Sequence, residues 1–428
     1  MSTRTASATE TSVHFLDELF AACPLENVAI RLWDGTLWPD ENPKPATLVI
    51  HHPGALRAMF ESGTEKGLAE AYLHNDFDIA GNIEDAFELA DALGRRGSGQ
   101  WLKTLANYYR LSQLPSPSTR QTAAQSFRRV GGQAHSLGRD REAVSFHYDV
   151  SNDFYRLWLD RRMQYSCAYF ERAGDDIDAA QTAKLHHLCR KLRLKPGQRV
   201  LDIGCGWGGF AIFAAQEYGV KVTGVTLSRR QADLACARAK DAGFSRSVEI
   251  LLRDYRELKE KESFDAIVSV GMSEHVGEDQ LANYFKAVGV LLKPGGVFLN
   301  HAIGEGVRKR PRAGPSFIDE YVFPDTDIPP IPAVLRAAES GGFEVRDVEN
   351  LREHYTLTLR HWLRRLEARH DAALAFVNEP TYRVWRLYLA GSAHGFHCGQ
   401  LALYQALLSK PDGHGRSHLP LTRRDWYA

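Results

Sequence analysis

The chain has 428 residues, of which 44% are hydrophobic and 25% charged, the ordinary composition of a globular protein with about two domains. Lysine plus arginine equals aspartate plus glutamate at 53 each, so no overall positive field points to a nucleic-acid partner. The six cysteines form no CxxC pair, which argues against a disulfide framework or zinc knuckle and favours a reducing, cytosolic setting.

The first twenty residues lack the core of a signal peptide, because Asp17 and Glu18 interrupt their apolar stretch. No apolar run approaches the roughly 18–20 residues that a membrane span requires. The sequence therefore predicts no membrane-spanning segment, and any lipid would have to be met at a membrane surface.

Residues 1–110 predict a small α+β domain. Phe15, Leu16, Leu19 and Phe20 form one face of an amphipathic helix that stops near Pro24. Residues 28–33 alternate as a half-buried strand does, a turn signal follows at residues 34–35, and a second strand is expected at residues 47–50. Helices are expected around residues 55–61, 67–74 and 83–93. No cluster of catalytic side chains is visible in this domain.

Residues 111–141 predict a flexible linker. The stretch is rich in Pro, Ser, Thr and Gly and holds few apolar residues that could be buried.

Residues 142–428 form the predicted catalytic domain, in which strands and helices alternate. Strands are expected at residues 199–203, 221–226, 248–252, 264–270, 297–302, 345–348 and 401–408. Helices are expected at residues 209–218, 228–242 and 281–291. Alternation of this kind predicts an α/β fold with a doubly wound, mostly parallel, Rossmann-like sheet.

A glycine-rich stretch, Asp202-Ile-Gly-Cys-Gly-Trp-Gly-Gly209, ends the first of these strands and opens the following helix. Glycines there let a nucleotide approach the backbone closely, although a tight structural turn would use the same residues. An NAD enzyme would carry an acid at the end of the second strand, where residues 224–231 have none. Asp202 before the glycines and Lys293-Pro-Gly-Gly296 before the fifth strand instead favour S-adenosylmethionine (SAM).

Five motifs in order resemble the cyclopropane fatty acid synthases, a family that includes the mycolic acid cyclopropane synthases. They are residues 146–152, 164–170, 202–209, 224–228 and 273–277. The similarity runs from about residue 142 to the end of the chain, and residues 1–110 match more loosely the extra domain of the long bacterial synthases. The resemblance implies a class I methyltransferase fold, an N-terminal lipid-binding or dimerisation domain and a homodimer.

The resemblance also assigns the cofactor site. Tyr165 and Ser166 would contact SAM, with Asp202 beside the glycine loop, and Gly204 and Gly206 would line its methionine portion. The remaining positions would surround the ribose, adenine and sulfonium groups: Thr226, Leu227, Gln231, Asp254, Tyr255, Arg256 and Val270.

In the family, a bound bicarbonate ion acts as the base that removes a proton after methyl transfer. The matching positions are Cys167, Glu274, His301, Ile303 and Tyr355, with Ile303 acting through its backbone. Cys167 could instead be a buried hydrophobic thiol, Glu274 a residue at a helix start and His301 a residue that caps a strand end. Tyr355 is matched through a region of low similarity. Family members usually carry a cysteine where this chain has Ser392, and a carbocation mechanism has no need of that thiol.

The expected substrate is the unsaturated acyl chain of a phospholipid. Phe317, Ile318, Tyr321, Val322 and Phe323 resemble the segment that lines the acyl channel, although core packing would use the same side chains. Arg308, Lys309, Arg310 and Arg312 could contact anionic lipid or form a solvated loop. We therefore expect a cytoplasmic enzyme, peripheral at the inner membrane surface, with no metal site.

The resulting prediction is a cyclopropane-fatty-acyl-phospholipid synthase that uses SAM and bicarbonate. The alternatives are a related SAM enzyme that leaves a methyl or methylene branch or hydroxylates the cation, a small-molecule O- or N-methyltransferase, and a non-catalytic lipid carrier.

Overall fold

The computed structural model describes residues 3–95, 105–116, 139, 151–308, 317–323 and 326–427. These residues divide into two compact units. The first comprises the described parts of Met1–Arg129, Pro311–Val322 and Asn378–His394, and the second those of Val130–Arg310, Phe323–Val377 and Gly395–Ala428. The sequence analysis assigns the two later segments of the first unit to the catalytic domain, so the division differs there. Most of the expected linker lies outside the described residues.

The first unit is built on a four-stranded sheet in the order β2-β1-β3-β4, in which only β1 and β3 run parallel. The expected turn at Asp34-Gly35 connects β1 to β2, with Gly35 at φ 96°. Strand β4 and helix α5 were not predicted from the sequence. The elements are α1 (Thr3–Phe20), β1 (Val28–Arg31), β2 (Leu37–Trp38), β3 (Ala46–Ile50), α2 (Ala55–Phe60), α3 (Glu65–Leu73), β4 (Phe77–Gly81), α4 (Phe87–Arg95) and α5 (Leu105–Gln113).

Two segments from the second half of the chain complete the first unit. Helix α12 (Phe317–Tyr321) packs on α3, where Glu320 forms an ion pair with Lys66 at 2.7 Å. Helix α16 (Glu379–His397) contributes Arg383, which is buried and donates hydrogen bonds to Asn75 Oδ1 at 2.8 Å and to Asp78 Oδ2 at 3.0 Å. These polar contacts span more than 250 residues of sequence, which is why no local pattern announces them.

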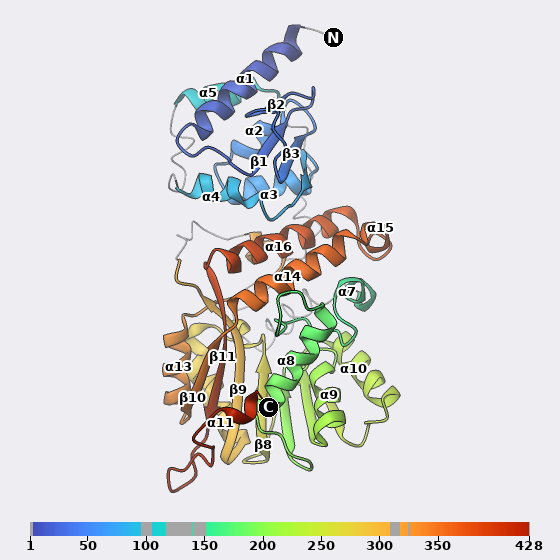
Figure 1. The fold of residues 1–428 in the computed structure, drawn as a ribbon, viewed down its shortest axis with the longest axis vertical. Helices are drawn as coiled ribbons and strands as arrows, with labels where there is room; N and C mark the ends of the chain where they lie inside the picture. The colour runs from blue at the N-terminus through green and yellow to red at the C-terminus, as the bar shows by residue number, and fades with distance from the viewer. Residues whose placement is uncertain are drawn as a thin grey trace. The chain divides into compact units, whose positions relative to one another are not determined.

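The second unit contains a seven-stranded sheet in the order β10-β11-β9-β8-β5-β6-β7, which confirms the expected mostly parallel α/β fold (Figure 1). Strands β9, β8, β5, β6 and β7 are parallel, while β11 is antiparallel to both β9 and β10. The strands are β5 (Arg199–Ile203), β6 (Lys221–Thr226), β7 (Val248–Leu252), β8 (Phe264–Val270), β9 (Leu292–Glu305), β10 (Glu344–Asn350) and β11 (Leu401–Ser409).

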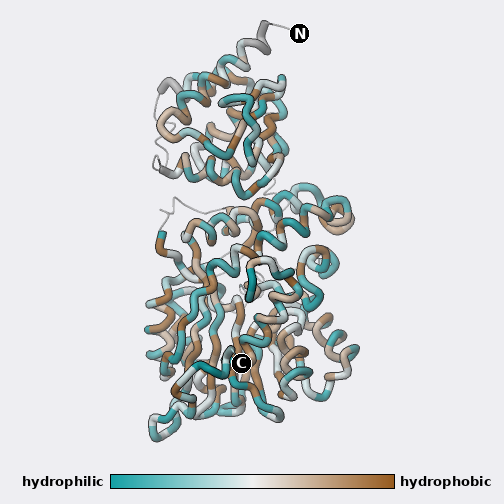
Figure 2. The backbone as a smooth tube through the Cα atoms, in the orientation of Figure 1, coloured by the Kyte–Doolittle hydropathy of each residue, from teal (hydrophilic) through white to brown (hydrophobic). Residues whose placement is uncertain are grey.

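Alternate residues of each central strand face opposite layers of helices. Val200 belongs to the core that α8, α9 and α10 cover, whereas its neighbour Leu201 belongs to the core under α11 and α13. This burial on both faces explains why the buried positions of the central strands are mostly apolar (Figure 2). The helices are α7 (Asn152–Trp158), α8 (Ile177–Lys191), α9 (Gly209–Tyr218), α10 (Arg229–Asp241), α11 (Leu281–Leu291), α13 (Ile331–Ser340), α14 (Arg352–Glu367) and α15 (His370–Ala373). Among the described helices, none has the length and apolar character needed to cross a bilayer.

Candidate active site

The loop between β5 and α9 is shaped by its glycines. Gly204, Gly206 and Gly208 adopt φ angles of 78°, 53° and 75°, a region that side chains with a Cβ rarely occupy. A Cβ at Gly204 would also lie 3.1 Å from Met272 Cγ. The backbone N–H groups of Gly204 and Cys205 both donate to the carbonyl of Val225 at 3.0 Å, which ties the loop to the end of β6. The loop is therefore held open toward the carboxyl edge of the sheet.

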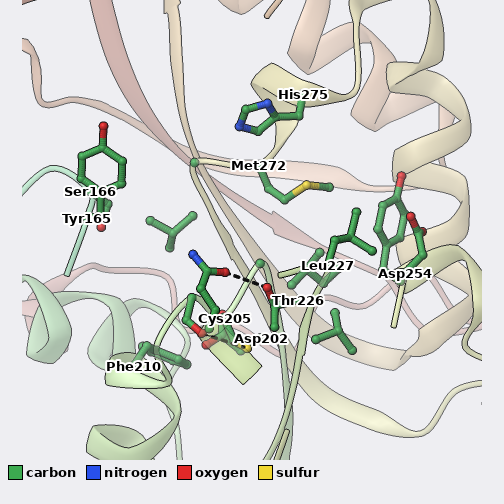
Figure 3. Close-up of a pocket in the computed structure, with 18 of the residues that line it drawn as sticks. Tyr165, Ser166, Asp202, Cys205, Phe210, Thr226, Leu227, Asp254, Met272 and His275 are labelled. Carbon is green, nitrogen blue, oxygen red and sulfur yellow. Dashed lines mark hydrogen bonds between the residues drawn. The ribbon is translucent and has the colours of Figure 1, made fainter. Parts of the chain in front are cut away.

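A cavity of about 270 Å³ lies at this edge. It brings together all twelve residues that the sequence analysis proposed for cofactor binding: Tyr165, Ser166, Asp202, Gly204, Gly206, Thr226, Leu227, Gln231, Asp254, Tyr255, Arg256 and Val270. Figure 3 shows Tyr165 and Ser166 on one side of the cavity and Leu227 and Asp254 on the other. Open α/β sheets place their ligands in such a crevice, beyond the carboxyl ends of the strands.

The polar side chains of the wall are held by one another. Thr226 Oγ1 donates to Gln231 Oε1 at 2.7 Å, the contact drawn in Figure 3. Asp254 caps the short helix η2 (Tyr255–Glu257), and its carboxylate accepts hydrogen bonds from the backbone and guanidinium of Arg256. These contacts preorganise the region that would receive a ribose and an adenine.

Further residues of the cavity escaped the sequence analysis as site residues. They are Met163, Gln164, Leu188, Ile203, Cys205, Trp207, Phe210, Val225, Arg253, Gly271, Met272, His275, Val276, Gln280, Asn283 and Tyr284. Most of them are next to one of the recognised motifs in the sequence, so those motifs could have predicted them as site residues. Asn283 and Tyr284 come from α11, where nothing in the sequence distinguished them from ordinary helix residues.

A buried lysine lies beneath the cavity. Lys184, on α8, is 1% exposed and donates to Gln164 Oε1 at 2.7 Å and to Ser166 Oγ at 3.0 Å. Burial lowers the pKa of Lys184 to about 8, although nearby Asp160 and Asp202 oppose that shift. Burial likewise raises the pKa of Asp202 to about 7, against the charge of Lys184. The sequence analysis missed Lys184, since a single lysine in a helix gives no signal.

Glu274 lies just beyond the end of β8, and His301 lies within β9. Glu274, in the short helix η3 (Ser273–His275), accepts a hydrogen bond from the backbone N–H of Ile303 at 2.7 Å through Oε1. His301 stands opposite Val270 in the sheet, and its Nδ1 lies 3.1 Å from Gln405 Nε2. The two side chains are 4% and 1% exposed, so neither belongs to the surface.

Each of these two residues leaves one buried polar atom unsatisfied. Glu274 Oε2 and His301 Nε2 are enclosed yet have no hydrogen-bond partner among the described residues. Burial raises the pKa of Glu274 to about 7 and lowers the pKa of His301 well below its usual value. Because the Gln405 amide donates to Nδ1, the neutral imidazole of His301 carries its proton on Nε2. An unsatisfied acceptor and an unsatisfied donor in one region suit a small ionic ligand.

The other proposed catalytic residues are placed differently. The backbone N–H of Ile303 is already bound to Glu274. The Cys167 thiol is fully buried, donates to the carbonyl of Ala168 at 3.2 Å, and has its pKa raised by that burial. Tyr355, on α14, is buried with its ring centre 4.7 Å from that of Phe396. Cys167, Glu274, His301, Ile303 and Tyr355 all lie in the second unit, outside the cavity lining given above.

The proposed channel residues do not line this cavity. Phe317, Ile318, Tyr321 and Val322 belong to the first unit, where Tyr321 Oη lies 3.4 Å from Glu70 Oε1. Phe323 belongs to the second unit, and its ring centre lies 5.8 Å from that of His275, a cavity residue. Ser392 is buried on α16. Arg308 is described, whereas Lys309, Arg310 and Arg312 lie outside the described residues.

Several known proteins are similar to this chain. Residues 135–406 match the family model described as mycolic acid cyclopropane synthetase. A protein of Pseudomonas putida named "Probable fatty acid methyltransferase" is 40% identical over 93% of this chain and 95% of its own. The cyclopropane-fatty-acyl-phospholipid synthase of Escherichia coli K12 is 41% identical over 62% of this chain and 66% of its own.

Among solved structures, the mycolic acid cyclopropane synthase CmaA1 in complex with SAH and CTAB superposes with a TM-score of 0.59. It is 36% identical, and the match covers 63% of this chain and 97% of that one. The superposed structure is therefore of the same fold and was solved with a product of SAM. The chain belongs to the mycolic acid cyclopropane synthetase family and is a SAM-dependent methyltransferase.

Proposed function

We propose that the protein transfers a methylene group from SAM to the cis double bond of a phospholipid acyl chain, at a membrane surface, and closes a cyclopropane ring. The observation that carries this proposal is the pair of unsatisfied buried atoms, Glu274 Oε2 and His301 Nε2. Glu274 precedes the cavity residue His275 in the chain, and His301 pairs with the cavity residue Val270 in the sheet. An oxygen or nitrogen methyltransferase needs a base before methyl transfer. A pair of proton-handling groups enclosed in protein suits deprotonation of a cation afterwards.

The chemistry of an alkene explains the enclosure. An isolated alkene has no proton to remove, so methyl attack leaves a carbocation that water would destroy. Glu274 and His301 are both nearly unexposed, as a site that must keep water from a cation requires. The Tyr165 ring, with its centre 5.3 Å from that of Trp362, offers an aromatic face that attracts positive charge.

The residues present fit a bicarbonate ion. His301 Nε2–H would donate to it, Glu274 Oε2 would face it, and the Cys167 and Tyr355 side chains are buried in the same unit. Bound there, bicarbonate would supply a base stronger than the His301 imidazole, whose pKa is lowered by burial. The chain contributes orientation: Ile303 fixes Glu274, and Gln405 fixes the tautomer of His301.

A second product is supported by one observation. The relative that matches 93% of this chain is named a fatty acid methyltransferase, whereas the named cyclopropane synthase of Escherichia coli matches 62%. A branched alkene would arise if the same cation lost a proton without closing the ring, directly for a methyl branch and after a hydride shift for a methylene branch. Both outcomes share the methyl transfer and differ in the fate of the cation.

The experiment is direct. Purified protein is incubated with SAM and vesicles of a monounsaturated phospholipid, and the fatty acid methyl esters are analysed by mass spectrometry and NMR. A product heavier by one CH₂ with cyclopropane proton signals supports ring closure. A branch without a ring supports the second product. Absence of any lipid product from protein that binds SAM would overturn the proposal.

A further inference from the structure

A second cleft, of about 450 Å³, lies in the same unit as the cofactor cavity. Its lining is dominated by five arginines drawn from α7, the loop after it, α10, α14 and the turn after α14. The residues are Arg156, Leu159, Asp160, Arg161, Met163, Asp178, Arg238, Arg365 and Arg369. The arginines are far apart in sequence, so the cleft exists only in the folded chain.

Three of the five guanidinium groups donate to backbone carbonyls, and that of Arg365 also pairs with Asp178. Arg238 donates to the carbonyl of Trp207 at 2.6 Å and to that of Arg162 at 3.1 Å. Arg365 donates to the carbonyl of Leu159 at 2.8 Å, and Arg369 to that of Leu157. A carbonyl holds a guanidinium in place without cancelling its charge, so the cleft keeps its positive potential.

The acids of the cleft are already engaged. The Asp160 carboxylate accepts the backbone N–H groups of Arg162 at 2.8 Å and Gln164 at 2.6 Å. Asp178 accepts from Arg365 at 3.0 Å and from the backbone N–H of Arg161 at 2.7 Å. Burial lowers the pKa of Arg238, and Arg156 and Arg162 add to that effect while Asp160 opposes it. Positive charge therefore exceeds negative charge in this cleft.

Three of the arginines are exposed: Arg369, which the Leu157 carbonyl holds, and Arg156 and Arg161. Arg156 is half exposed and pairs with Asp153 at 2.5 Å, an exposed contact that an incoming anion could replace. Arg161 is exposed, and only its backbone N–H is recruited by Asp178. The cleft thus combines three arginines held by backbone carbonyls, Arg238, Arg365 and Arg369, with two more adjustable ones.

The cleft and the cofactor cavity share a wall. Met163 lines both, and it sits at φ 54° in a turn closed by its N–H on the carbonyl of Asp160 at 2.8 Å. The next residue, Gln164, is held by Lys184 at 2.7 Å. A ligand in the cleft would therefore touch the segment that borders the cofactor.

We propose that this arginine cleft is a binding site for a phosphate group, either free or carried by a lipid headgroup. Guanidinium forks match the geometry of phosphate oxygens, and several of them around one anion outcompete a single lysine. The site goes beyond the proposed function, because it requires neither methyl transfer nor a particular acyl chain.

The test measures binding and not turnover. Equilibrium dialysis with radiolabelled inorganic phosphate at low salt is performed on wild type, on Arg156→Gln/Arg161→Gln and on Arg246→Gln. Arg246 is an exposed arginine of the same unit outside the cleft and serves as the matched control. We expect the double variant to weaken phosphate binding by about tenfold or more and the control to leave it unchanged. Circular dichroism and thermal unfolding verify that all three proteins are folded.

Competition distinguishes the two sources. Vesicles of phosphatidylglycerol that displace the labelled phosphate from wild type identify a lipid headgroup as ligand. Phosphate binding that such vesicles leave unchanged identifies a soluble phosphate. Absence of phosphate binding to wild type, or equal weakening in Arg246→Gln and in the double variant, would overturn the proposal. Because no outcome depends on product formation, a protein without methyltransferase activity would still give a clear answer.

Discussion

The Nζ atom of Lys184 lies 2.7 Å from Gln164 Oε1 and 3.0 Å from Ser166 Oγ, so one buried ammonium group holds two side chains that border the cofactor cavity. The cation is far from water and close to Asp160, Cys167 and Asp202. Burial of a charge is costly, and such a charge is kept where its hydrogen bonds fix a geometry. Lys184 is therefore a positioning residue of the cofactor site.

Replacing Lys184 with Met should weaken SAM binding by about tenfold, because Gln164 and Ser166 lose the donor that they share. Leaving a buried polar group without a hydrogen bond costs about 1–3 kcal/mol. Isothermal titration with SAM measures the effect. Lys221→Met, an exposed lysine on β6, is the matched control and should bind as wild type does. An unchanged Kd in a folded Lys184→Met protein would show that the ammonium does not position the site.

Glu274→Gln should lower the rate of lipid product formation by about 10²–10⁴-fold while leaving SAM affinity unchanged. The amide oxygen of glutamine can still accept from Ile303 N–H, so the loop keeps its anchor and only the titrating group is lost. Rates are measured by mass spectrometry of fatty acid methyl esters. Glu278→Gln, an exposed neighbour on the short helix Glu278–Gln280, controls for the change of charge. Equal rates in wild type and Glu274→Gln would remove Glu274 from the catalytic group.

Stability should depend on pH through Glu274 in a definite direction. Burial raises the pKa of Glu274 to about 7 from an unfolded value of 4.5, so the folded state holds the proton more tightly. The resulting stabilisation is complete below the unfolded pKa and is lost as pH rises through about 7. Urea unfolding without SAM should show wild type losing up to about 3 kcal/mol relative to Glu274→Gln between about pH 5 and pH 8. Asp202 titrates in both proteins and cancels in the difference. A constant difference across this range would contradict the raised pKa.

The cysteine thiols should differ in their rate of chemical modification according to their exposure. Burial raises the pKa of Cys167, Cys189 and Cys205, whereas Cys236 is exposed. In the folded protein, Ellman's reagent should modify Cys236 about a hundredfold faster than the three buried thiols, which react only after unfolding. Cys236→Ser should abolish the fastest phase and leave the slower reaction of the partly buried Cys23 and Cys398. Rapid modification of Cys167 in that variant would indicate an accessible, activated thiol, which the buried setting does not provide.

The sequence was informative wherever structure is local. The four strands β5 to β8 and the helices α9 and α11 match the expected ranges to the residue, because apolar runs bounded by glycine and charge specify them. Strand β9 begins five residues earlier than expected, since the Lys293–Gly296 turn continues into the ladder with a shift in register. All twelve proposed cofactor residues meet in one cavity because the ends of parallel strands share one edge.

Long-range contacts were not predictable in the same way. Ala168 N–H donates to Thr358 Oγ1 and Phe170 N–H to His354 Nδ1, both across about half the chain, and these contacts position α14 beside the Tyr165–Phe170 segment. Nothing in either segment alone specifies the other. The membership of α12 and α16 in the first unit has the same cause, since buried Arg383 finds its acceptors some 300 residues upstream.

The discontinuity of the first unit constrains how the chain is made. When a ribosome has released residues 1–129, the carbonyl of Tyr72 and the side chains of Asn75 and Asp78 still lack Arg383, which is synthesised only after most of the second unit. The hydrogen bonds of these three residues to the Arg383 guanidinium can form only after that point. A fragment that begins at residue 142 would have the converse problem. It would contain Arg383 on α16 but would lack Tyr72, Asn75 and Asp78, the residues that accept its hydrogen bonds.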